Sequence, residues 1–264
     1  MNTGTTTAHP LEQRTAVMSG ATRGVGRDVA LALAEAGMNI CLLTHNPVDA
    51  ALTVKLIEIA GGNVVALPCM VDDDAALTDA MSQACVMFDT GVDLMFINMG
   101  LMPDAYDYPQ APVGHITGDQ WSDYMESSSR GAFVSTARAA RYMQNQPQGG
   151  VIINTAFHGG TARPGLALYA ASRAALRAVC DTVNLESAAE GLPVRAHMLA
   201  SGDTERDRDA IVDTVLKLAY AVGRDQAPTI IDLRRPRQEA VAAPSWMTIL
   251  TTARWIRWPS QNRT

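Results

Sequence analysis

The sequence predicts one doubly wound α/β domain built on a parallel sheet of seven strands. Short apolar runs alternate along the chain with longer helical patterns, and glycine, asparagine or proline marks many of the junctions. Strands that are apolar along their whole length are buried on both faces, which is typical of parallel sheets covered by helices. Because crossovers between parallel strands are right-handed, the alternation gives a Rossmann-type sheet. The 264 residues suffice for one such domain and its core.

The first half of the chain carries four of the expected strands. Its second helix begins with Asn46 as N-cap and Pro47 at the first position, both of which are favoured at helix starts. The first helix ends at Gly37, the residue type that most often closes a helix. The expected segments are strand Thr15–Ser19, helix Gly24–Ala36, strand Asn39–Thr44, a helix from Pro47 to Gly61, strand Asn63–Leu67, helix Asp73–Phe88 and strand Val92–Asn98.

The second half adds two long helices, a shorter one and three strands. Gly191 ends the second long helix. The expected segments are helix Thr117–Gln146, strand Val151–Thr155, helix Gly165–Glu190, strand Val194–Leu199, helix Asp209–Val222 and strand Thr229–Leu233.

The chain divides into three parts by composition. We expect a disordered lead at residues 1–11, a single domain over residues 12–233, and a tail over residues 234–264. The tail holds three of the four tryptophans, and Trp246, Ile249 and Leu250 fall on one stripe of a helix. We expect this Trp-rich helix to dock on a neighbouring subunit or over the cleft; a basic amphipathic helix at a membrane surface is the alternative.

Composition excludes several classes of function. The net charge of −6 provides no basic field for nucleic acid. No apolar run reaches the roughly 18 residues of a membrane helix, and the N-terminus has no signal-peptide pattern. The four cysteines form no C-x-x-C pair, so we expect buried reduced thiols, no metal site and a cytoplasmic location.

Two motifs carry the functional signal. The turn Ser19-Gly-Ala-Thr-Arg-Gly-Val-Gly26 lies between a strand and a helix, where glycines let the backbone approach a pyrophosphate and the helix N-terminus favours it. The second motif is Tyr169-Ala-Ala-Ser-Arg173. Together they resemble the signatures T-G-x-x-x-G-x-G and Y-x-x-x-K of the short-chain dehydrogenase/reductase family. The segment Asp93-Leu-Met-Phe-Ile-Asn-Met-Gly100 is similar to the family's D-I-L-V-N-N-A-G. The resemblance spans residues 12–233 and implies a dinucleotide-binding domain.

The resemblance implies a nicotinamide cofactor, and the residues favour NADP(H) over NAD(H). NAD-selective proteins end the second strand with an acidic residue that binds the ribose hydroxyls. Thr44 and His45 stand there instead, and Arg23 adds a cation for a 2′-phosphate. Met70 replaces the family's adenine-contacting aspartate before Val71, which predicts weaker binding. The expected cofactor-binding residues are Gly20, Thr22, Arg23, Gly24, Val25, Gly26, Thr44, His45, Val71, Asn98, Gly100, Tyr169 and Arg173.

The family's catalytic tetrad is degenerate in this chain. The resemblance makes Tyr169 the general acid/base and puts Arg173 in place of a lysine that lowers the tyrosine pKa. A guanidinium supplies the charge but does not release its proton for a relay. Ser128 stands at the family's asparagine position, and Ala156 at its serine position. The expected catalytic residues are Tyr169, Arg173 and Ser128. His158 is a further acid/base candidate near the cleft.

The substrate lid of the family is shortened here. Only the polar segment Asp203–Arg208 separates the sixth strand from the next helical pattern, although the family's threonine is retained as Thr204. We therefore expect an open pocket, or one covered by another part of the chain.

Three functions follow from this pattern. The first is an atypical NADP(H)-dependent oxidoreductase that reduces a ketone or an imine. The second is a non-redox enzyme of the same fold, such as a lyase, isomerase, cyclase or dehalogenase-like enzyme. The third is a non-catalytic binding or scaffold protein. The two long helices pair across a two-fold axis in the family, which implies a homodimer or homotetramer acting on a small-molecule substrate.

Overall fold

The computed structural model describes residues 11–99, 111–157, 162–202, 205–223 and 227–233. The chain divides into two units, Met1–Arg234 and Arg235–Thr264, and the fold below is that of the first. The predicted Trp-rich tail helix, Gly100, His158 and Thr204 lie outside the described residues. Leu11, the last residue of the predicted lead, is fully buried and donates its backbone N–H to the carbonyl oxygen of Ala36 at 3.3 Å.

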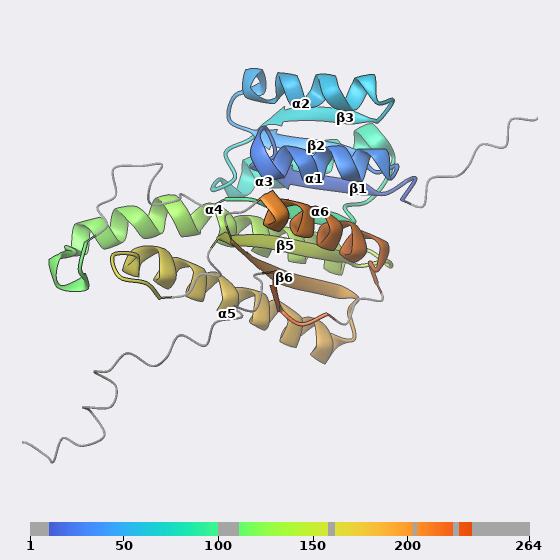
Figure 1. The fold of residues 1–264 in the computed structure, drawn as a ribbon. Helices are drawn as coiled ribbons and strands as arrows, with labels where there is room; N and C mark the ends of the chain where they lie inside the picture. Colours follow the sequence, from blue (N-terminus) through green and yellow to red (C-terminus); the bar gives the residue numbers. More distant parts are fainter. Residues whose placement is uncertain (1–10, 100–110, 158–161, 203–204, 224–226, 234–264) are drawn as a thin grey trace, which may run out of the picture. The chain divides into compact units, whose positions relative to one another are not determined.

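A single sheet of seven strands forms the centre of the domain, in the order β3-β2-β1-β4-β5-β6-β7. Every neighbouring pair is parallel, which confirms the predicted doubly wound fold. Figure 1 shows the strands stacked between helices. The strands are β1 (Thr15–Ser19), β2 (Asn39–Thr44), β3 (Val64–Pro68), β4 (Leu94–Ile97), β5 (Gly150–Phe157), β6 (Val194–Ser201) and β7 (Ile230–Asp232).

Helices cover both faces of the sheet and enclose two hydrophobic clusters. One cluster contains the buried sides of α3, α4 and α5, and the other contains those of α1, α2 and α6. Successive strand residues alternate between them: Val17 belongs to the first cluster, and Ala16 and Met18 to the second. The helices are α1 (Gly24–Glu35), α2 (Pro47–Ile59), α3 (Asp74–Phe88), α4 (Gly118–Gln144), α5 (Ala167–Glu190) and α6 (Glu205–Tyr220), with a short 3₁₀ turn η2 (Val113–His115).

Helix boundaries follow the capping signals. Asn46 accepts a hydrogen bond from the Val48 N–H, and Thr117 forms a capping box with Gln120 at the start of α4. Several boundaries differ from prediction by one or two residues, and the largest difference is at α6, which begins at Glu205 rather than Asp209, so most of the predicted polar connection is helical. Acidic residues favour a helix N-terminus, where the macrodipole is positive. The connection after β6 is therefore shorter than the sequence pattern indicates.

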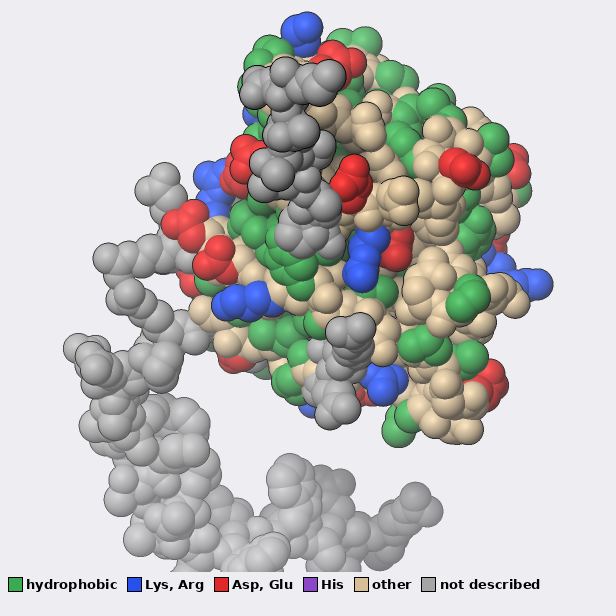
Figure 2. Space-filling view, turned by 90° about the vertical axis from the view of Figure 1, so that its right-hand side faces the viewer, with side chains coloured by type: hydrophobic (Ala, Val, Ile, Leu, Met, Phe, Trp, Pro, Cys, Tyr) green, Lys and Arg blue, Asp and Glu red, His purple; other side chains and the backbone are tan. Residues whose placement is uncertain are grey.

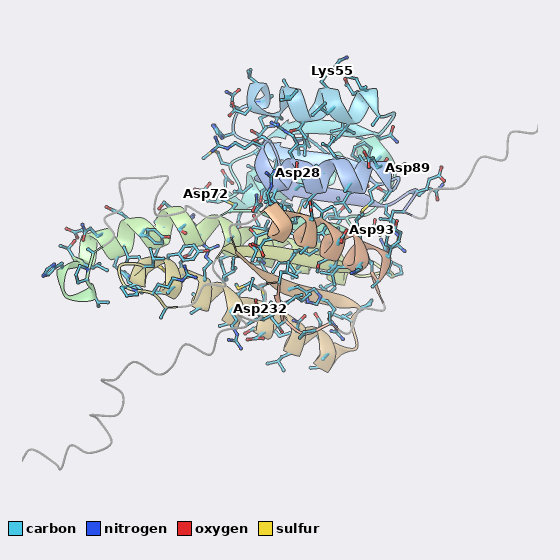
Figure 3. The ribbon with its side chains drawn as sticks, viewed as in Figure 1. Asp28, Lys55, Asp72, Asp89, Asp93 and Asp232 are labelled. Atoms are coloured by element: carbon cyan, nitrogen blue, oxygen red, sulfur yellow. The ribbon has the colours of Figure 1, made fainter. Side chains whose placement is uncertain are left out.

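The sheet has an amino edge, where its parallel strands begin, and a carboxyl edge, where they end. At the amino edge, the Asp93 carboxylate accepts the Thr15 backbone N–H at 2.9 Å, and burial raises the pKa of Asp93. In Figure 3, Asp89 and Asp93 lie at this edge and Asp72 lies at the opposite, carboxyl edge. At that carboxyl edge β1 sits between β2 and β4, where the strand order reverses. Doubly wound sheets bind ligands at such a switch point.

Three further features can be described: the distribution of charge on one face, the apolarity of the helices and the state of the cysteines. Acidic and basic side chains are interspersed on the face in Figure 2 rather than separated by sign. Within the described ranges, no helix has the length and apolarity needed to cross a membrane. The four cysteines are free thiols; Cys85 is partly exposed and the other three are buried.

Candidate cofactor and active site

The turn after β1 depends on its glycines for three different reasons. Gly20 has a φ of 66°, and a Cβ there would collide with the carbonyl oxygen of Asn98. A Cβ on Gly26 would collide with the carbonyl oxygen of Gly20, so the helix packs directly on its own turn. Gly24 has a φ of 56°, and nothing lies within 4 Å of its Cβ position. Gly24 also lines a cleft. Its lack of a side chain therefore leaves space open beside the cleft, whereas at Gly20 and Gly26 the space is filled by protein backbone.

The N-terminus of α1 opens into the same cleft. The N-cap is Arg23, whose side chain makes no capping hydrogen bond, and the first turn of α1 carries no acidic residue. The first N–H groups of a helix need partners and bear positive partial charge, which suits an anion. The open space at Gly24 beside these groups fits the pyrophosphate of a dinucleotide.

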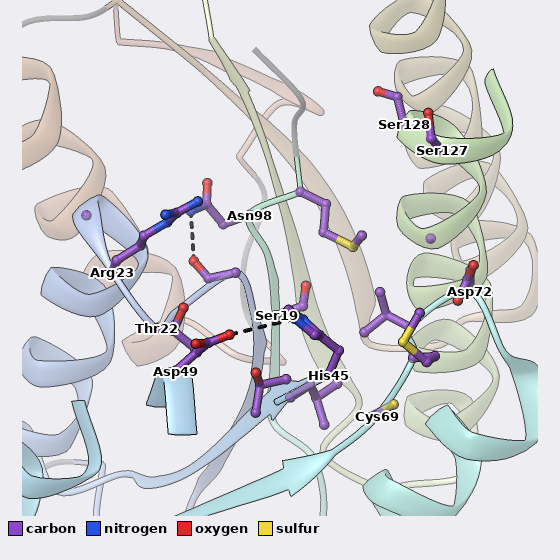
Figure 4. Close-up of a pocket in the computed structure, with 18 of the residues that line it drawn as sticks. Ser19, Thr22, Arg23, His45, Asp49, Cys69, Asp72, Asn98, Ser127 and Ser128 are labelled. Carbon is purple, nitrogen blue, oxygen red and sulfur yellow. Dashed lines mark hydrogen bonds and ion pairs between the residues drawn. The ribbon is translucent and has the colours of Figure 1, made fainter. Parts of the chain in front are cut away.

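The cleft itself has a volume of about 720 Å³ and follows the carboxyl edge of the sheet. Figure 4 shows it between the turn after β1 on one side and α4 on the other. Ten of the predicted site residues line it: Gly20, Thr22, Arg23, Gly24, Val25, Thr44, His45, Val71, Asn98 and Ser128. Tyr169, Arg173 and Gly26 are described but are not among its lining residues.

Asn98 connects the turn after β1 to β5. Its side-chain amide donates to the Gly20 carbonyl at 3.0 Å, and its Oδ1 accepts the hydroxyl of Thr155 at 2.8 Å. The turn after β1 is thereby fastened to β4 and β5. Thr155 therefore supports the turn, a contact that sequence reasoning did not anticipate.

The end of the cleft near β2 contains an acidic residue that sequence reasoning missed. Asp49 lines the cleft, and its Oδ2 lies 3.7 Å from Nε2 of His45. The Thr44 hydroxyl is engaged elsewhere: it donates to the Asn46 carbonyl at 2.9 Å and accepts the Asn46 N–H at 3.2 Å. The i,i+4 spacing of His45 and Asp49 was the available signal.

The far wall of the cleft combines the segment after β3 with α4. The Met99 side chain reaches α4, where its methyl carbon would lie 2.8 Å from a Cβ on Gly131. Cys69 also lines this wall, and burial, followed by the charges of Asp73 and Asp72, raises its pKa to about 11. The thiol is therefore neutral near physiological pH.

Arg173 is buried and held by several hydrogen bonds. Only 1% of its surface is exposed. Its Nη1 donates to the Met99 carbonyl at 2.9 Å, and its Nη2 donates to the carbonyl and the hydroxyl of Ser128 at 3.0 and 3.2 Å. Its Nε donates to the Ser172 hydroxyl at 3.2 Å. Burial lowers the pKa of the guanidinium, and Tyr169 and Tyr124 oppose that shift.

Tyr169 lies beside this guanidinium. The Arg173 guanidinium carbon is 5.6 Å from the centre of the Tyr169 ring, within cation–π range, and the tyrosine is 2% exposed. Ser128 connects the pair to the cleft, since it lines the cleft and also accepts from Arg173. Ala156, at the family's serine position, is buried. The structure thus brings the three predicted catalytic residues together; their catalytic roles stay predictions.

No metal centre is indicated. Among the residues that the structure describes, no three histidine, cysteine or acidic side chains gather as potential ligands.

Comparison with known proteins now identifies the family. The model of the short chain dehydrogenase family matches residues 14–213. Over 201 residues the chain is 24% identical to 2,3-dihydro-2,3-dihydroxybenzoate dehydrogenase of Bacillus subtilis strain 168, covering 76% of this chain and 73% of that protein. It is 27% identical over 184 residues to 3-oxoacyl-(acyl-carrier-protein) reductase FabG of Staphylococcus epidermidis, covering 69% and 72%.

Solved structures share the fold. A short chain dehydrogenase from Mycobacterium smegmatis superposes with a TM-score of 0.74 at 21% identity, covering 87% of this chain and 95% of that one. The NADH-dependent reductase A1-R′ complexed with NAD gives 0.70 at 20% identity, with 84% and 95% covered. A metagenomic short-chain oxidoreductase in complex with NADP gives 0.70 at 21%, with 84% and 97% covered. With its family match, glycine turn and sheet topology together, this chain belongs to the short-chain dehydrogenase/reductase family of oxidoreductases.

Proposed function

We propose that the protein is an NADP(H)-dependent oxidoreductase that reduces the carbonyl group of a ketone or the C=N group of an imine. The observation that carries the proposal is the open N-terminus of α1, with the side-chain-free face of Gly24 directed into a cleft at the switch point. This is the geometry that a pyrophosphate requires. Membership of an oxidoreductase family supports the same conclusion.

Different lining residues would hold different parts of the cofactor. The turn from Gly20 to Gly24 would bind the pyrophosphate, and Val71 would lie against the adenine. Arg23 and His45, both at the adenosine end, would bind the 2′-phosphate by charge-assisted contacts. When bound, NADPH would supply the hydride.

Tyr169 would donate the proton. The adjacent guanidinium of Arg173 stabilises a negative charge on the tyrosine oxygen, which makes the hydroxyl a better acid. Because Arg173 is fixed by Met99 and Ser128, it stays in place through a turnover. It does not pass the proton on, since a guanidinium keeps its own.

A second candidate is a non-redox reaction or a binding role on the same fold. It is favoured by one observation: every nitrogen of the Arg173 guanidinium already donates to a protein acceptor, which leaves at most one N–H, on Nη1, for a cofactor ribose. A non-redox enzyme would use the tyrosine–arginine pair directly, and a scaffold would use neither.

The decisive experiment starts with titrations of NADPH and NADH against the purified protein, followed by a panel of ketones and imines. We expect NADPH to bind more tightly than NADH, and Tyr169→Phe to abolish turnover without loss of NADPH binding. Equal affinity for both nucleotides, or none for either, would contradict the cofactor assignment. Tight NADPH binding with no consumption across the panel would favour the second candidate.

We also propose that the protein is a homodimer or homotetramer joined through α4 and α5. Two adjacent surface grooves of about 390 and 410 Å³ run along these helices, and Phe133, which is 51% exposed, lines both. Ala137, Ala140 and Ala175 also line them and allow close approach of a second helix pair. Light scattering at micromolar concentration should give a multiple of the chain mass; a monomer would contradict the proposal, and Phe133→Glu should weaken the assembly.

A further inference from the structure

The adenosine end of the cleft holds a carboxylate directly beside a group that the proposed function assigns to phosphate binding. Asp49 and His45 both line the cleft, with Oδ2 and Nε2 3.7 Å apart. Their side chains are 49% and 72% exposed, so both are accessible to a ligand. Figure 4 shows Thr22, Arg23, Asp49 and His45 at one end of the pocket, away from Ser127 and Ser128.

A short, well-bonded connection fixes this pair. Thr44 ends β2, and its hydroxyl closes the turn against both backbone groups of Asn46. Asn46 then caps α2, and the Asp49 N–H donates to the Asn46 carbonyl at 3.0 Å. Asp49 is thereby held in the first turn of α2, one turn beyond His45. The backbone of Asp49 is thereby fixed beside the cleft.

Few other charged side chains of the described residues lie near the adenosine end of the cleft. The charged residues that line the described cleft are Arg23, His45, Asp49, Asp72 and Glu126. Asp72 and Glu126 belong to the opposite wall, where Glu126 is paired with Arg130 at 2.9 Å. Arg27 on α1 is turned away, to the Thr22 carbonyl and the Thr53 hydroxyl, and Asp28 is paired with Arg208 of α6. The balance at the adenosine end is therefore set by Arg23, His45 and Asp49.

We propose that Asp49 is a specificity-determining residue, which limits the preference of this chain for a 2′-phosphorylated adenosine, and that His45 controls how strongly it does so. This rests on the proposed function. A carboxylate repels a phosphate but accepts hydrogen bonds from the free hydroxyls of a ribose. Asp49 therefore disfavours NADPH and favours NADH, against the effect of Arg23.

His45 couples this balance to protonation. A protonated imidazole neutralises Asp49 and donates to a 2′-phosphate, whereas a neutral one leaves the carboxylate charge uncompensated. Binding of the phosphate therefore favours uptake of a proton by His45. His45 should therefore favour NADPH over NADH more at low pH than at high pH, and the ionisation of the 2′-phosphate itself acts in the opposite direction.

The test compares Asp49→Asn with Asp72→Asn, which removes the same charge from the opposite wall of the same cleft. Affinities for NADPH and NADH are measured by calorimetry at about pH 6 and about pH 8, which span the usual range of histidine titration. We expect Asp49→Asn to raise the ratio of NADPH to NADH affinity roughly five-fold at the higher pH. Asp72→Asn should change that ratio by less than about two-fold.

Two further variants complete the test. Asp49→Ser, which keeps a residue favoured at a helix start, should reproduce Asp49→Asn. His45→Gln should lower the ratio at the lower pH relative to the unaltered chain, and should leave only the pH dependence that comes from ionisation of the 2′-phosphate.

The outcomes separate this inference from the proposed function. If the unaltered chain binds neither nucleotide, both are overturned. If it binds NADPH but the ratio stays unchanged in Asp49→Asn and Asp49→Ser, or Asp72→Asn shifts it equally, only the role of Asp49 is overturned. A pH dependence of the ratio that is the same in His45→Gln as in the unaltered chain overturns the role of His45.

Discussion

The turn after β1 and the cluster around Arg173 both carry residues of the family's signatures, and they differ in what their side chains are free to do. At the turn, Gly24 faces open space and Arg23 is exposed at the edge of the cleft. In the cluster, Arg173 is 1% exposed and its guanidinium is bonded to Met99, Ser128 and Ser172. The groups of the first region are therefore open to a ligand, whereas those of the second are used in bonds within the protein.

The difference shows that a matched motif position does not by itself make a functional group available. Arg173 preserves a positive charge next to Tyr169, as the family's lysine would. Its planar fork, however, satisfies acceptors on the segment after β4 and on α4 that a single ammonium could not reach together. The substitution therefore exchanges a mobile relay group for a rigid connection.

The largest expected effect concerns the turn. Gly20→Ala combines a positive φ with a collision against the Asn98 carbonyl, so it should lower the free energy of unfolding by about 3 kcal/mol. Gly24→Ala is the matched control: it has a similar φ but no neighbour within 4 Å, so it should cost only about 1 kcal/mol.

Gly24→Ala should weaken NADPH binding even though it costs little stability. Gly24→Ala fills the space proposed for the pyrophosphate, so its NADPH affinity should fall at least about ten-fold while the protein stays folded. Urea denaturation and NADPH titration of the two variants give both quantities. Equal losses of stability, or undiminished NADPH binding in Gly24→Ala, would remove the distinction between a packing glycine and a ligand-facing one.

The next effect tests the Arg173 cluster. Arg173→Met leaves the Met99 carbonyl and Ser128 without their donor, so it should lower the free energy of unfolding by about 2–3 kcal/mol. Arg173→Lys retains the charge and one donor, and should be about half as destabilising. Thermal and urea denaturation of both variants measure this.

Activity of Arg173→Lys separates the candidate functions. If the chain is an altered reductase, lysine restores the family pattern, and turnover should be retained or raised. If the guanidinium fork itself serves a non-redox reaction, turnover should fall. Under a scaffold role, stability alone should change.

A smaller effect concerns Arg23. Arg23→Ala removes a charge-assisted contact to the 2′-phosphate, so NADPH binding should weaken by about 1–3 kcal/mol. NADH binding and the free energy of unfolding should each change by less than about 0.5 kcal/mol, because Arg23 is exposed. Parallel losses for NADPH and NADH would mean that Arg23 contacts another part of the nucleotide.

The smallest effect concerns Cys69, which lines the cleft without being reactive. Its pKa of about 11 leaves the thiol protonated at pH 8, so iodoacetamide should label it slowly there, and faster only as the pH approaches that value. Mass spectrometry of the labelled protein identifies the site. Rapid labelling of Cys69 at pH 8 would contradict the neutral-thiol assignment.

Much of the fold could be predicted because local signals are strong where the chain changes element. Pro47 and Gly191 mark a helix start and a helix end, and the wholly apolar strands leave little choice of architecture. The start of α1 at Gly24 was equally readable, since a strand, a glycine turn and a helix follow one another directly.

The rest of the site depends on contacts between distant segments, which spacing does not reveal. The burial of Arg173 follows from the approach of β4 and α4, and the support from Thr155 follows from the pairing of β5 beside β4. Asp49 is an intermediate case. It lies one turn from His45, so its position could have been read from the spacing, but its exposure to the cleft could not.

The Arg173 contacts also predict which segments of the protein unfold locally together. They join residues separated by 74 and by 45 positions in the chain, and the full set forms only when the segment after β4, α4 and α5 are all docked. Local opening of α5 breaks every one of these interhelical and helix–segment bonds, and opening of α4 breaks those to Ser128, so α4 and α5 should form one cooperative unit in native-state hydrogen exchange. Amides in the interior of α4 and α5 should then share a single opening free energy, whereas those of α2, which has no contact with Arg173, should exchange through openings of their own.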